Sequence, residues 1–527
     1  MFIKAAMLIV FFALTVFIGI YFRKRAASVN GFVLAGRSVG PWLTAFAYGT
    51  SYFSAVIFIG YAGQFGWKYG MAATWIGLGN AFIGSLLPWI ILGRRTRVMT
   101  HHLNSATMPE FFGSRFLSPA LKIGAALIIF IFLIPYTASL YNGLSRLFSM
   151  AFHIDFIYCI IGMAVITAIY VVAGGYFATA VNDFIQGIIM LVGIVAVIAV
   201  MFRNNGGFLA TVDALSRVTE VNADGAVTSA PGVFASLLGP DPLNLLGVVI
   251  LTSLGTWGLP QMVSKFYAIK SEKTILKGAV ISTAFAVVIA GGCYFFGGFG
   301  RIYQPEIMSS LNITSISDIK FDAIIPAILS SGFSDFLIGL IVLLVLSASI
   351  STLSSLVITS SSTLTLDFIK GHVVKKLNDK KQLFIIRALI VVFILISVII
   401  AVVQYKGSVV FIAQLMGISW GALAGAFLAP YLFSLYWKGV TRPAVWCNFG
   451  FSVIFMLANA SMNIFPAQTK FLADIFPAIL KSPINAGAFT MLAGFIIVPV
   501  VSLLTKAPAK EAVEDCFSCY DKAADAK

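Results

Sequence analysis

The sequence predicts an all-α, polytopic membrane protein, and its composition and one recurring pattern carry that prediction. Of its 527 residues, 59% are hydrophobic and only 10% are charged, and the mean hydropathy is +0.97. In soluble domains, about a quarter of the residues are charged. Apolar windows of about 20 residues, the length that crosses a bilayer as a helix, recur along the whole chain. We therefore expect about thirteen transmembrane helices.

The first window, residues 2–22, is expected to be a true membrane span and not a signal peptide. Its basic cluster, Arg23, Lys24 and Arg25, follows the apolar run instead of preceding it. The run is also too long for the apolar region of a signal peptide. The other spans are expected at 41–64, 71–93, 118–150, 155–174, 180–202, 243–266, 275–299, 336–366, 382–404, 408–437, 441–461 and 485–505.

The placement of charge predicts how the chain is oriented. An odd number of spans puts the two ends on opposite sides of the membrane. Loops assigned to the inside hold most of the 35 Lys and Arg residues, among them Lys265 and Lys270, whereas outside loops carry acids such as Asp213 and Asp241. Because basic loops stay in the cytoplasm, we expect the N-terminus outside and the C-terminus inside. The net charge of +15 is thus an orientation signal and not a nucleic-acid footprint.

Two of the expected spans are interrupted near their middle. Span 41–64 carries Gly49, Thr50 and Ser51 there, and span 243–266 carries Gly258 and Pro260. Gly and Pro inside a span break the helical ladder and free backbone carbonyls. They are also ordinary in membrane helices, but matching positions five spans apart favour an inverted repeat, with binding sites where the broken helices meet.

This pattern predicts one transmembrane domain over residues 1–505 and a short polar cytoplasmic tail over 506–527. Within the domain, two repeats are expected at 41–202 and 243–437. An extra helix and loop at 1–40 precede them, and two extra helices at 438–505 follow them.

Hydroxyl groups crowd the ninth span, SASISTLSSLVITSSSTLTLDF, from Ser347 to Phe368. Three interpretations are open: close helix packing with hydroxyls bonded back to the preceding turn, a water-lined pore, or a site for a small hard cation. Six hydroxyls favour a cation, and a partner segment has to decide. Those that share one face about 120° wide are Ser347, Ser351, Ser354, Ser355, Ser362 and Thr365, flanked by Ala348 and Thr352.

Several motifs in chain order resemble the sodium/solute symporter family, whose members include sodium–glucose, sodium–proline, sodium–pantothenate and sodium–sialic acid transporters. The resemblance covers nearly the whole chain. It implies the leucine-transporter fold of five plus five helices and sodium-driven symport of a small organic solute by alternating access, at the plasma (cell inner) membrane. The motifs are FVLAGRSVGPW, TMPEFFGSRF, GGYFATAVNDFIQ, GLPQMVSKFYAIK, ASISTLSSLVITSSSTLTLDF and APYLFSLYWKGVT.

The resemblance implies a first sodium site between the broken second span and the ninth. Its ligands would be the carbonyls of Thr50, Phe53 and Ala348 and the hydroxyls of Ser351 and Thr352. Such a set is physically reasonable, since unwound carbonyls are free to coordinate and two hydroxyls complete an oxygen cage without a fixed charge.

Some family members have a second sodium site, which here would use Asp183, Ser351, Ser354 and Ser355. An acid inside a membrane span is by default a candidate functional residue. Asp183 is equally compatible with an interfacial acid at a helix start, preceded by Asn182 as a cap. Both interpretations stay open, and so does the choice between one and two coupling ions.

The substrate is expected beside the two breaks. The proline branch of the family has an aspartate where this chain has Tyr52, and the sugar branch has glutamines at the positions of Ile57 and Trp420. These departures favour a small carboxylate or an amino acid over a sugar, because half-helix N-termini receive carboxylates; a sugar or vitamin is the alternative. The residues expected at the site are Tyr52, Ser54, Ser253, Thr256, Trp257 and Trp420, with Tyr136, Tyr141 and Asn142 as further candidates.

Other function classes fit the sequence less well. A solute sensor on the same fold would carry a long cytoplasmic signalling domain, and a channel would need ring symmetry. A proton-coupled porter would need a titratable group where Ala348, Ser351 and Thr352 stand. We expect no enzyme activity, no nucleic-acid partner, no cofactor besides sodium as the coupling ion, and a monomer in the lipid bilayer. The lone pair Cys516 and Cys519 is expected to be free thiols, because a structural zinc site needs four ligands.

Overall fold

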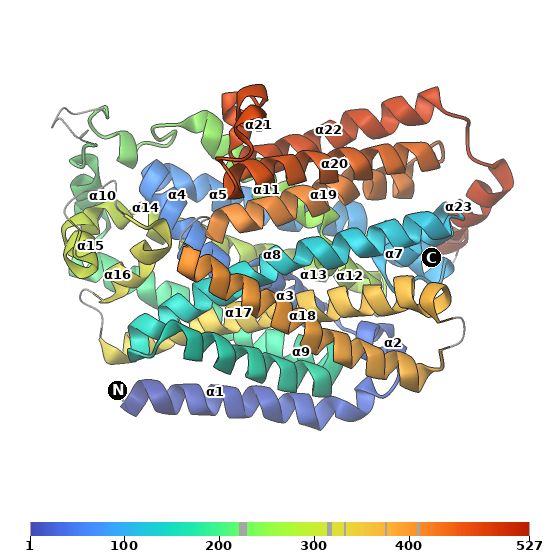
Figure 1. The fold of residues 1–527 in the computed structure, drawn as a ribbon. Coiled ribbons are helices and arrows are strands. Elements are labelled where there is room, and N and C mark those ends of the chain that lie inside the picture. Colours follow the sequence, from blue (N-terminus) through green and yellow to red (C-terminus); the bar gives the residue numbers. More distant parts are fainter. Residues whose placement is uncertain are drawn as a thin grey trace.

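The computed structural model describes residues 2–220, 229–313, 319–330, 334–374, 377–407 and 412–525; the first four residues of the expected span 408–437 and the last two of the tail lie outside this part. The described chain is helical, with two isolated β-bridges and no strand. The long helices lie side by side in one bundle, with α1 (Phe2–Tyr21) at its edge, and the N- and C-terminal ends lie at opposite ends of the bundle (Figure 1).

Ten helical stretches in the described part are long and apolar enough to cross a membrane, or eleven if the bent pair α11 (Pro242–Gly258) and α12 (Pro260–Tyr267) counts as one span. Two of the ten, with 47 and 49 residues, are more than twice as long as a crossing requires. Each contains a glycine with positive φ, Gly70 (φ 60°) and Gly175 (φ 59°), near the expected junctions of spans. The number thirteen stays a prediction.

Capping residues define where several of these helices begin. Thr107, Ser118 and Thr441 each accept a backbone hydrogen bond from the third residue after them, and a proline follows within the first turn. The other long helices are α8 (Pro119–Phe152), α9 (Phe156–Asn204), α13 (Lys273–Ala286), which a π-helical turn continues into the short α14 (Gly292–Gly298), α17 (Asp335–Thr363), α18 (Asp379–Gly407), α19 (Ile412–Tyr436), α20 (Arg442–Ile464) and α22 (Pro483–Leu504). Shorter helices are α2 (Val29–Leu34), α5 (Thr74–Ala81), α6 (Arg94–His102), α7 (Met108–Arg115), α10 (Phe208–Ser216), α15 (Gln304–Leu311), α16 (Ile324–Ser330) and α21 (Lys470–Ile475).

Both predicted interruptions are present. Helix α3 (Pro41–Tyr52) ends two residues before Ser54, and a π-helical turn, Val56–Tyr61, continues the span into α4 (Ala62–Tyr69). The Ser54 hydroxyl accepts the backbone N–H of Val56, which starts the chain into its second half-helix. In the other span, α11 and α12 meet at the extended residue Leu259 with a bend of 43°. Each span is therefore divided into two half-helices near its middle.

The ninth span is one of the two most buried spans in the described chain, and its hydroxyls face protein. Of the most apolar window of α17 and its π-helical extension, 83% of the residues are buried, against 33% for α18. Every residue of the hydroxyl stripe is at most 7% exposed. Helix α17 packs on α1, α3, α8 and α9. The stripe therefore has protein partners on several sides, as the cation interpretation requires.

A backbone link joins the segment before α3 to the segment after α12. The N–H of Val39 donates to the carbonyl of Ala268 at 3.2 Å, and the N–H of Lys270 donates to the carbonyl of Val39 at 3.0 Å. Val39 lies just before α3, and Ala268 and Lys270 lie just after α12. The link thus joins the start of the broken span in one expected repeat to the end of the broken span in the other.

The tail forms a docked helix, α23 (Lys510–Asp525), where the sequence predicted only a polar segment. It packs on α6, and the Tyr520 hydroxyl donates to the carbonyl of Arg95 at 3.2 Å. Cys516 and Cys519 are free and buried. Burial, with the neighbouring Cys516, raises the pKa of the Cys519 thiol to about 11, so this thiol stays protonated at neutral pH.

Helices α4 and α14 approach each other through glycines, and this contact yields a stability prediction. A methyl group on Gly66 would lie 2.1 Å from the carbonyl carbon and oxygen of Gly297, which are backbone atoms. We expect Gly66→Ala to destabilise the protein by at least about 1–3 kcal/mol, because the two helices must move apart. Thermal unfolding midpoints at one scan rate measure this. Gly162→Ala is the control, since its methyl group would meet no atom within 4 Å; equal midpoints for both variants would contradict the prediction.

Candidate functional site

The break after α3 lies against the middle of α17, as the first predicted sodium site requires. The Thr352 hydroxyl oxygen lies 3.2 Å from the Thr50 carbonyl oxygen, 3.3 Å from that of Ser51 and 3.0 Å from that of Ala348. The hydroxyl of the preceding residue, Ser351, donates to the Thr50 hydroxyl at 2.7 Å. All five residues are at most 2% exposed. Oxygens from two separate elements therefore converge in the interior.

The donor set at this point fits a small monovalent cation. It consists of uncharged carbonyl and hydroxyl oxygens, with no carboxylate among the five predicted ligands, so a single positive charge needs no extra compensation. Four of these five, Thr50, Ala348, Ser351 and Thr352, lie together in the contacts given above. Phe53 ends α3 in an extended conformation at the break, and the part of its carbonyl in the set stays a prediction.

Asp183, the acid of the second predicted sodium site, lies deep in the protein. It is 1% exposed, two turns beyond the Gly175 kink, with helix α9 continuing on both sides. The expectation that Asp183 stands at a helix start, with Asn182 as the cap, is therefore wrong. Within the described chain neither of its carboxylate oxygens is hydrogen-bonded, although the carboxylate lies close to the Ser351 hydroxyl and interacts with the charge of Lys265.

The three serines of the second predicted site differ in their contacts. Ser351 is bonded to Thr50, as described, and Ser354 donates back to the carbonyl of Ile350 on its own helix. Ser355 lies 2.8 Å from the Ser51 hydroxyl across the interface with α3. Close packing with back-bonding thus explains Ser354, as it does Ser362 and Thr365 further along the stripe, whereas Ser351 and Ser355 make contacts between helices.

Lys265 occupies a position that the sequence did not predict. It was expected in an inside loop, but it lies in α12 and is 1% exposed. Its ammonium donates to the Ser355 hydroxyl at 2.8 Å and lies 5.0 Å from the centre of the Tyr176 ring. An internal cation therefore stands beside Ser355, at the edge of the second predicted sodium site.

The predicted substrate residues lie together beside the breaks and are enclosed, each at most 6% exposed. Three of them donate hydrogen bonds to backbone carbonyls. Tyr52 donates to the Thr252 carbonyl at 2.6 Å, Thr256 to that of Gly84 at 2.8 Å and Trp257 to that of Ile83 at 2.8 Å. Ser253 donates to the side chain of Asn80, a residue not predicted, and Ser54 accepts from the backbone. These contacts hold the two breaks and α5 together.

Two aromatic residues of the same region keep donors without a partner. In the described part of the chain, neither the Trp420 indole N–H nor the Tyr136 hydroxyl is hydrogen-bonded, although Tyr136 lies near Ser54 and Trp420. The two rings meet edge to face at 5.9 Å, and the Tyr52 ring lies 6.2 Å from that of Trp420. Both donors are therefore unsatisfied by the described residues in this state.

The two remaining candidates on α8 are less directly placed. The Tyr141 hydroxyl is also unbonded among the described residues. The Asn142 amide is engaged by the side chains of Gln404 and Arg146, at 2.9 and 2.8 Å. Nothing in these contacts links Asn142 to the breaks.

Comparisons with known proteins agree with this arrangement. A model of the sodium:solute symporter family matches residues 32–449. The sodium/proline symporters of Staphylococcus aureus strains JH9 and COL are each 30% identical to this chain over 524 residues, covering 95% of this chain and 93% of theirs. A solved structure of a Na+-coupled sialic acid symporter, in a substrate-bound outward-open state, superposes with a TM-score of 0.74 at 16% identity, covering 97% of this chain and 99% of that one. At that identity the likeness shows the fold. The family match spans both broken helices and α17, and it makes the protein a membrane transport protein and not an enzyme. The chain therefore belongs to the sodium:solute symporter family.

Proposed function

We propose that this protein couples inward movement of sodium to uptake of a small carboxylate or amino acid. The observation that carries the proposal is the convergence of the Thr352 hydroxyl with the carbonyls of Thr50 and Ala348. Sodium would be held there by Thr50, Phe53, Ala348, Ser351 and Thr352. The membrane potential supplies about 2.3 kcal/mol per charge for each 100 mV.

Sodium at this position would tie the broken end of α3 to α17. Because Tyr52 belongs to the last turn of α3, the ion would also fix the substrate side of the break. The same protein elements would then rock between states that open to either side of the membrane. We propose the arrangement of the leucine-transporter fold for this motion, with five plus five helices, about thirteen spans and the C-terminus in the cytoplasm. The two matching breaks and the opposite positions of the chain ends support it.

The free donors beside the breaks favour a carboxylate as the solute. A carboxylate accepts several hydrogen bonds, and the Tyr136 hydroxyl and Trp420 indole offer two donors from different helices. The solutes named for the relatives, proline and sialic acid, are both carboxylic acids. The proline branch of the family has an aspartate at the position of Tyr52, and this difference argues against proline as the solute of this protein.

The contacts of Lys265 favour a single coupling sodium. A second sodium at Asp183 and Ser355 would lie next to the buried ammonium of Lys265, which already donates a hydrogen bond to the Ser355 hydroxyl. Two like charges this close in a buried site repel strongly. We therefore propose that sodium uses the first site and that the second position is filled by the protein's own cation.

The test of the function is uptake into proteoliposomes. Radiolabelled amino acids, monocarboxylates, sugars and vitamins are offered with an inward sodium gradient or with choline in its place. We expect at least one carboxylic acid to accumulate only with sodium. In the cell, we propose that the protein works as a monomer in the plasma (cell inner) membrane. Uptake that is the same in choline would refute sodium coupling.

Removal of one free donor is expected to weaken solute binding. Tyr136→Phe deletes the hydroxyl without changing the ring, and a hydrogen bond to a charged group is worth about 1.5–3 kcal/mol, so KM should rise about tenfold or more. Stability should not fall, because this hydroxyl has no partner among the described residues. Tyr431→Phe, which removes another fully buried hydroxyl, is the control. A KM that changes equally little in both variants would remove Tyr136 from the site.

A further inference from the structure

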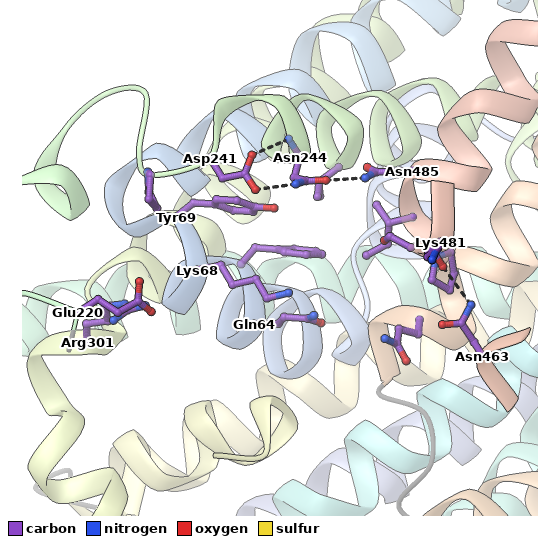
Figure 2. A pocket seen from close by; sticks show the side chains of 17 residues that line it. Gln64, Lys68, Tyr69, Glu220, Asp241, Asn244, Arg301, Asn463, Lys481 and Asn485 are labelled. Atoms are coloured by element: carbon purple, nitrogen blue, oxygen red, sulfur yellow. Dashed lines mark hydrogen bonds and ion pairs between the residues drawn. The ribbon is translucent and has the colours of Figure 1, made fainter. Parts of the chain in front are cut away.

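A large polar cavity lies at one end of the bundle, away from the site described above. It has a volume of about 630 Å³. Figure 2 shows Lys68 and Gln64 on one wall, the row Asp241, Asn244 and Asn485 opposite, and Lys481 at the side. Its walls come from α4, from the start of α11 and from the start of α22.

Three of the elements that line this cavity also carry the substrate residues. The span of α4 contains Gln64 here and Ser54 at the break, α11 contains Asn244 and Ser253, and α19 contains Gln414 and Trp420. These pairs are separated by about 9–15 Å of helix. Fully buried side chains such as Tyr61 and Leu251 lie between them along the chain. The cavity therefore stands in line with the enclosed central site.

The charges around the cavity are unevenly satisfied. Asp241 caps α11, accepting from the Asn244 backbone at 3.1 Å and from its amide at 2.6 Å, and Asn485 extends this row by donating to Asn244 at 2.6 Å. Glu220 is paired with Arg301 at 3.1 Å. By contrast, within the described chain neither Lys68 nor Lys481 forms an ion pair, and the Lys68 ammonium lies 5.2 Å from the centre of the Phe321 ring.

Two buried polar groups on the cavity wall also lack partners in the described part of the chain. They are Nη1 of Arg301, whose residue is 4% exposed, and Oε1 of Gln64, whose residue is 3% exposed. Unsatisfied groups at such burial are costly unless a ligand or water meets them. A solute that offers a carboxylate to the cations and an N–H or O–H to the Gln64 oxygen would satisfy both kinds.

We propose that this cavity is a capture site for a small carboxylic acid that also carries an N–H or O–H donor, with Lys68 as the group that receives the carboxylate. The proposal rests on the proposed function, because it places this solute on the path to the central site. It narrows the substrate class to amino acids and hydroxy acids and adds a second binding position.

Equilibrium binding to the purified full chain in sodium-free potassium buffer tests the proposal, with L-proline and L-lactate as radiolabelled probes and L-prolinamide as the competitor that lacks the carboxylate. We expect at least one acid to bind and L-prolinamide not to displace it. Lys68→Gln should weaken binding about tenfold, and Lys68→Arg should stay within about threefold of the original protein. Lys277→Gln, which changes an exposed lysine on α13, should leave binding unchanged.

Two results would overturn the proposal. One is binding that Tyr136→Phe abolishes and Lys68→Gln leaves unchanged, which would place the acid in the central site. The other is the absence of binding by either acid up to about 10 mM, a concentration above the dissociation constants of most weak specific complexes. Because the buffer contains no sodium and there is no gradient, these results are independent of the uptake test and separate failure of the capture site from failure of sodium coupling.

Discussion

Thr352→Ala is expected to abolish sodium-stimulated uptake while the protein still inserts and folds. The substitution removes a hydroxyl that lies within 3.3 Å of carbonyls of both α3 and α17, and with it both a proposed sodium ligand and a contact between the two elements. Loss of one well-placed oxygen should raise the sodium concentration needed for half-maximal uptake by at least about tenfold. Uptake measured against sodium concentration in proteoliposomes gives this value.

Two variants of the same helix serve as controls for Thr352. Thr352→Ser keeps the hydroxyl and should retain most of the activity. Thr363→Ala removes a buried hydroxyl that bonds only to carbonyls of its own helix, those of Thr359 and Ser360, so its sodium dependence should not change. A loss of uptake as large in Thr363→Ala as in Thr352→Ala would assign the effect to packing of α17 and not to ion binding.

Lys265→Met is expected to make the protein less stable without sodium and to make its stability more dependent on sodium than that of the original protein. Lys265 is the buried cation whose charge acts on the Asp183 carboxylate, so its removal leaves a buried charge uncompensated, which typically costs about 3–5 kcal/mol. Sodium can then take the place of the ammonium beside Asp183 and Ser355, and a bound ion stabilises by mass action. Thermal unfolding midpoints in increasing sodium chloride, at constant ionic strength with choline, measure the effect.

The double variant Lys265→Met with Asp183→Asn separates the explanations. It removes both charges, so its midpoint in choline should lie above that of Lys265→Met, and the added sodium dependence should disappear. If Lys265→Met alone responds to sodium no more than the original protein, then the ammonium does not occupy the second cation position. The charge moved per solute, measured in the same proteoliposomes, would rise only in the single variant.

The positions of spans and breaks could be predicted because they depend on local properties. Apolar length marks a span, and Gly and Pro near its middle mark an interruption. Helix α11 ends at the predicted Gly258, whereas α3 continues through the predicted Gly49–Ser51 to Tyr52 before the break. The pairing of elements at the first predicted sodium site could also be predicted, since the free carbonyls of a broken span and the hydroxyls of the ninth span each need polar partners. That they face each other at Thr352 is confirmed by the structure; that sodium binds there stays a prediction.

The second site could not be predicted to the same degree, because its contents depend on tertiary contacts. Counting basic residues by loop places Lys265 in the cytoplasm, whereas the helix that starts at Pro260 carries it inward to Ser355, 90 residues along the chain. The helix-start interpretation of Asp183 failed for a similar reason, since the helix resumes directly after the Gly175 kink and Asp183 lies two turns inside it. The free donors of Tyr136 and Trp420 likewise emerge only when all neighbours are known.

The link between Val39 and the Ala268–Lys270 segment consists of main-chain amides, and this gives the protein a built-in reporter. Any state in which that end of the bundle parts must expose the N–H groups of Val39 and Lys270 to water. Deuterium uptake at these two amides, followed with and without sodium, would therefore read out how often that end opens, in a chain that carries no label or substitution.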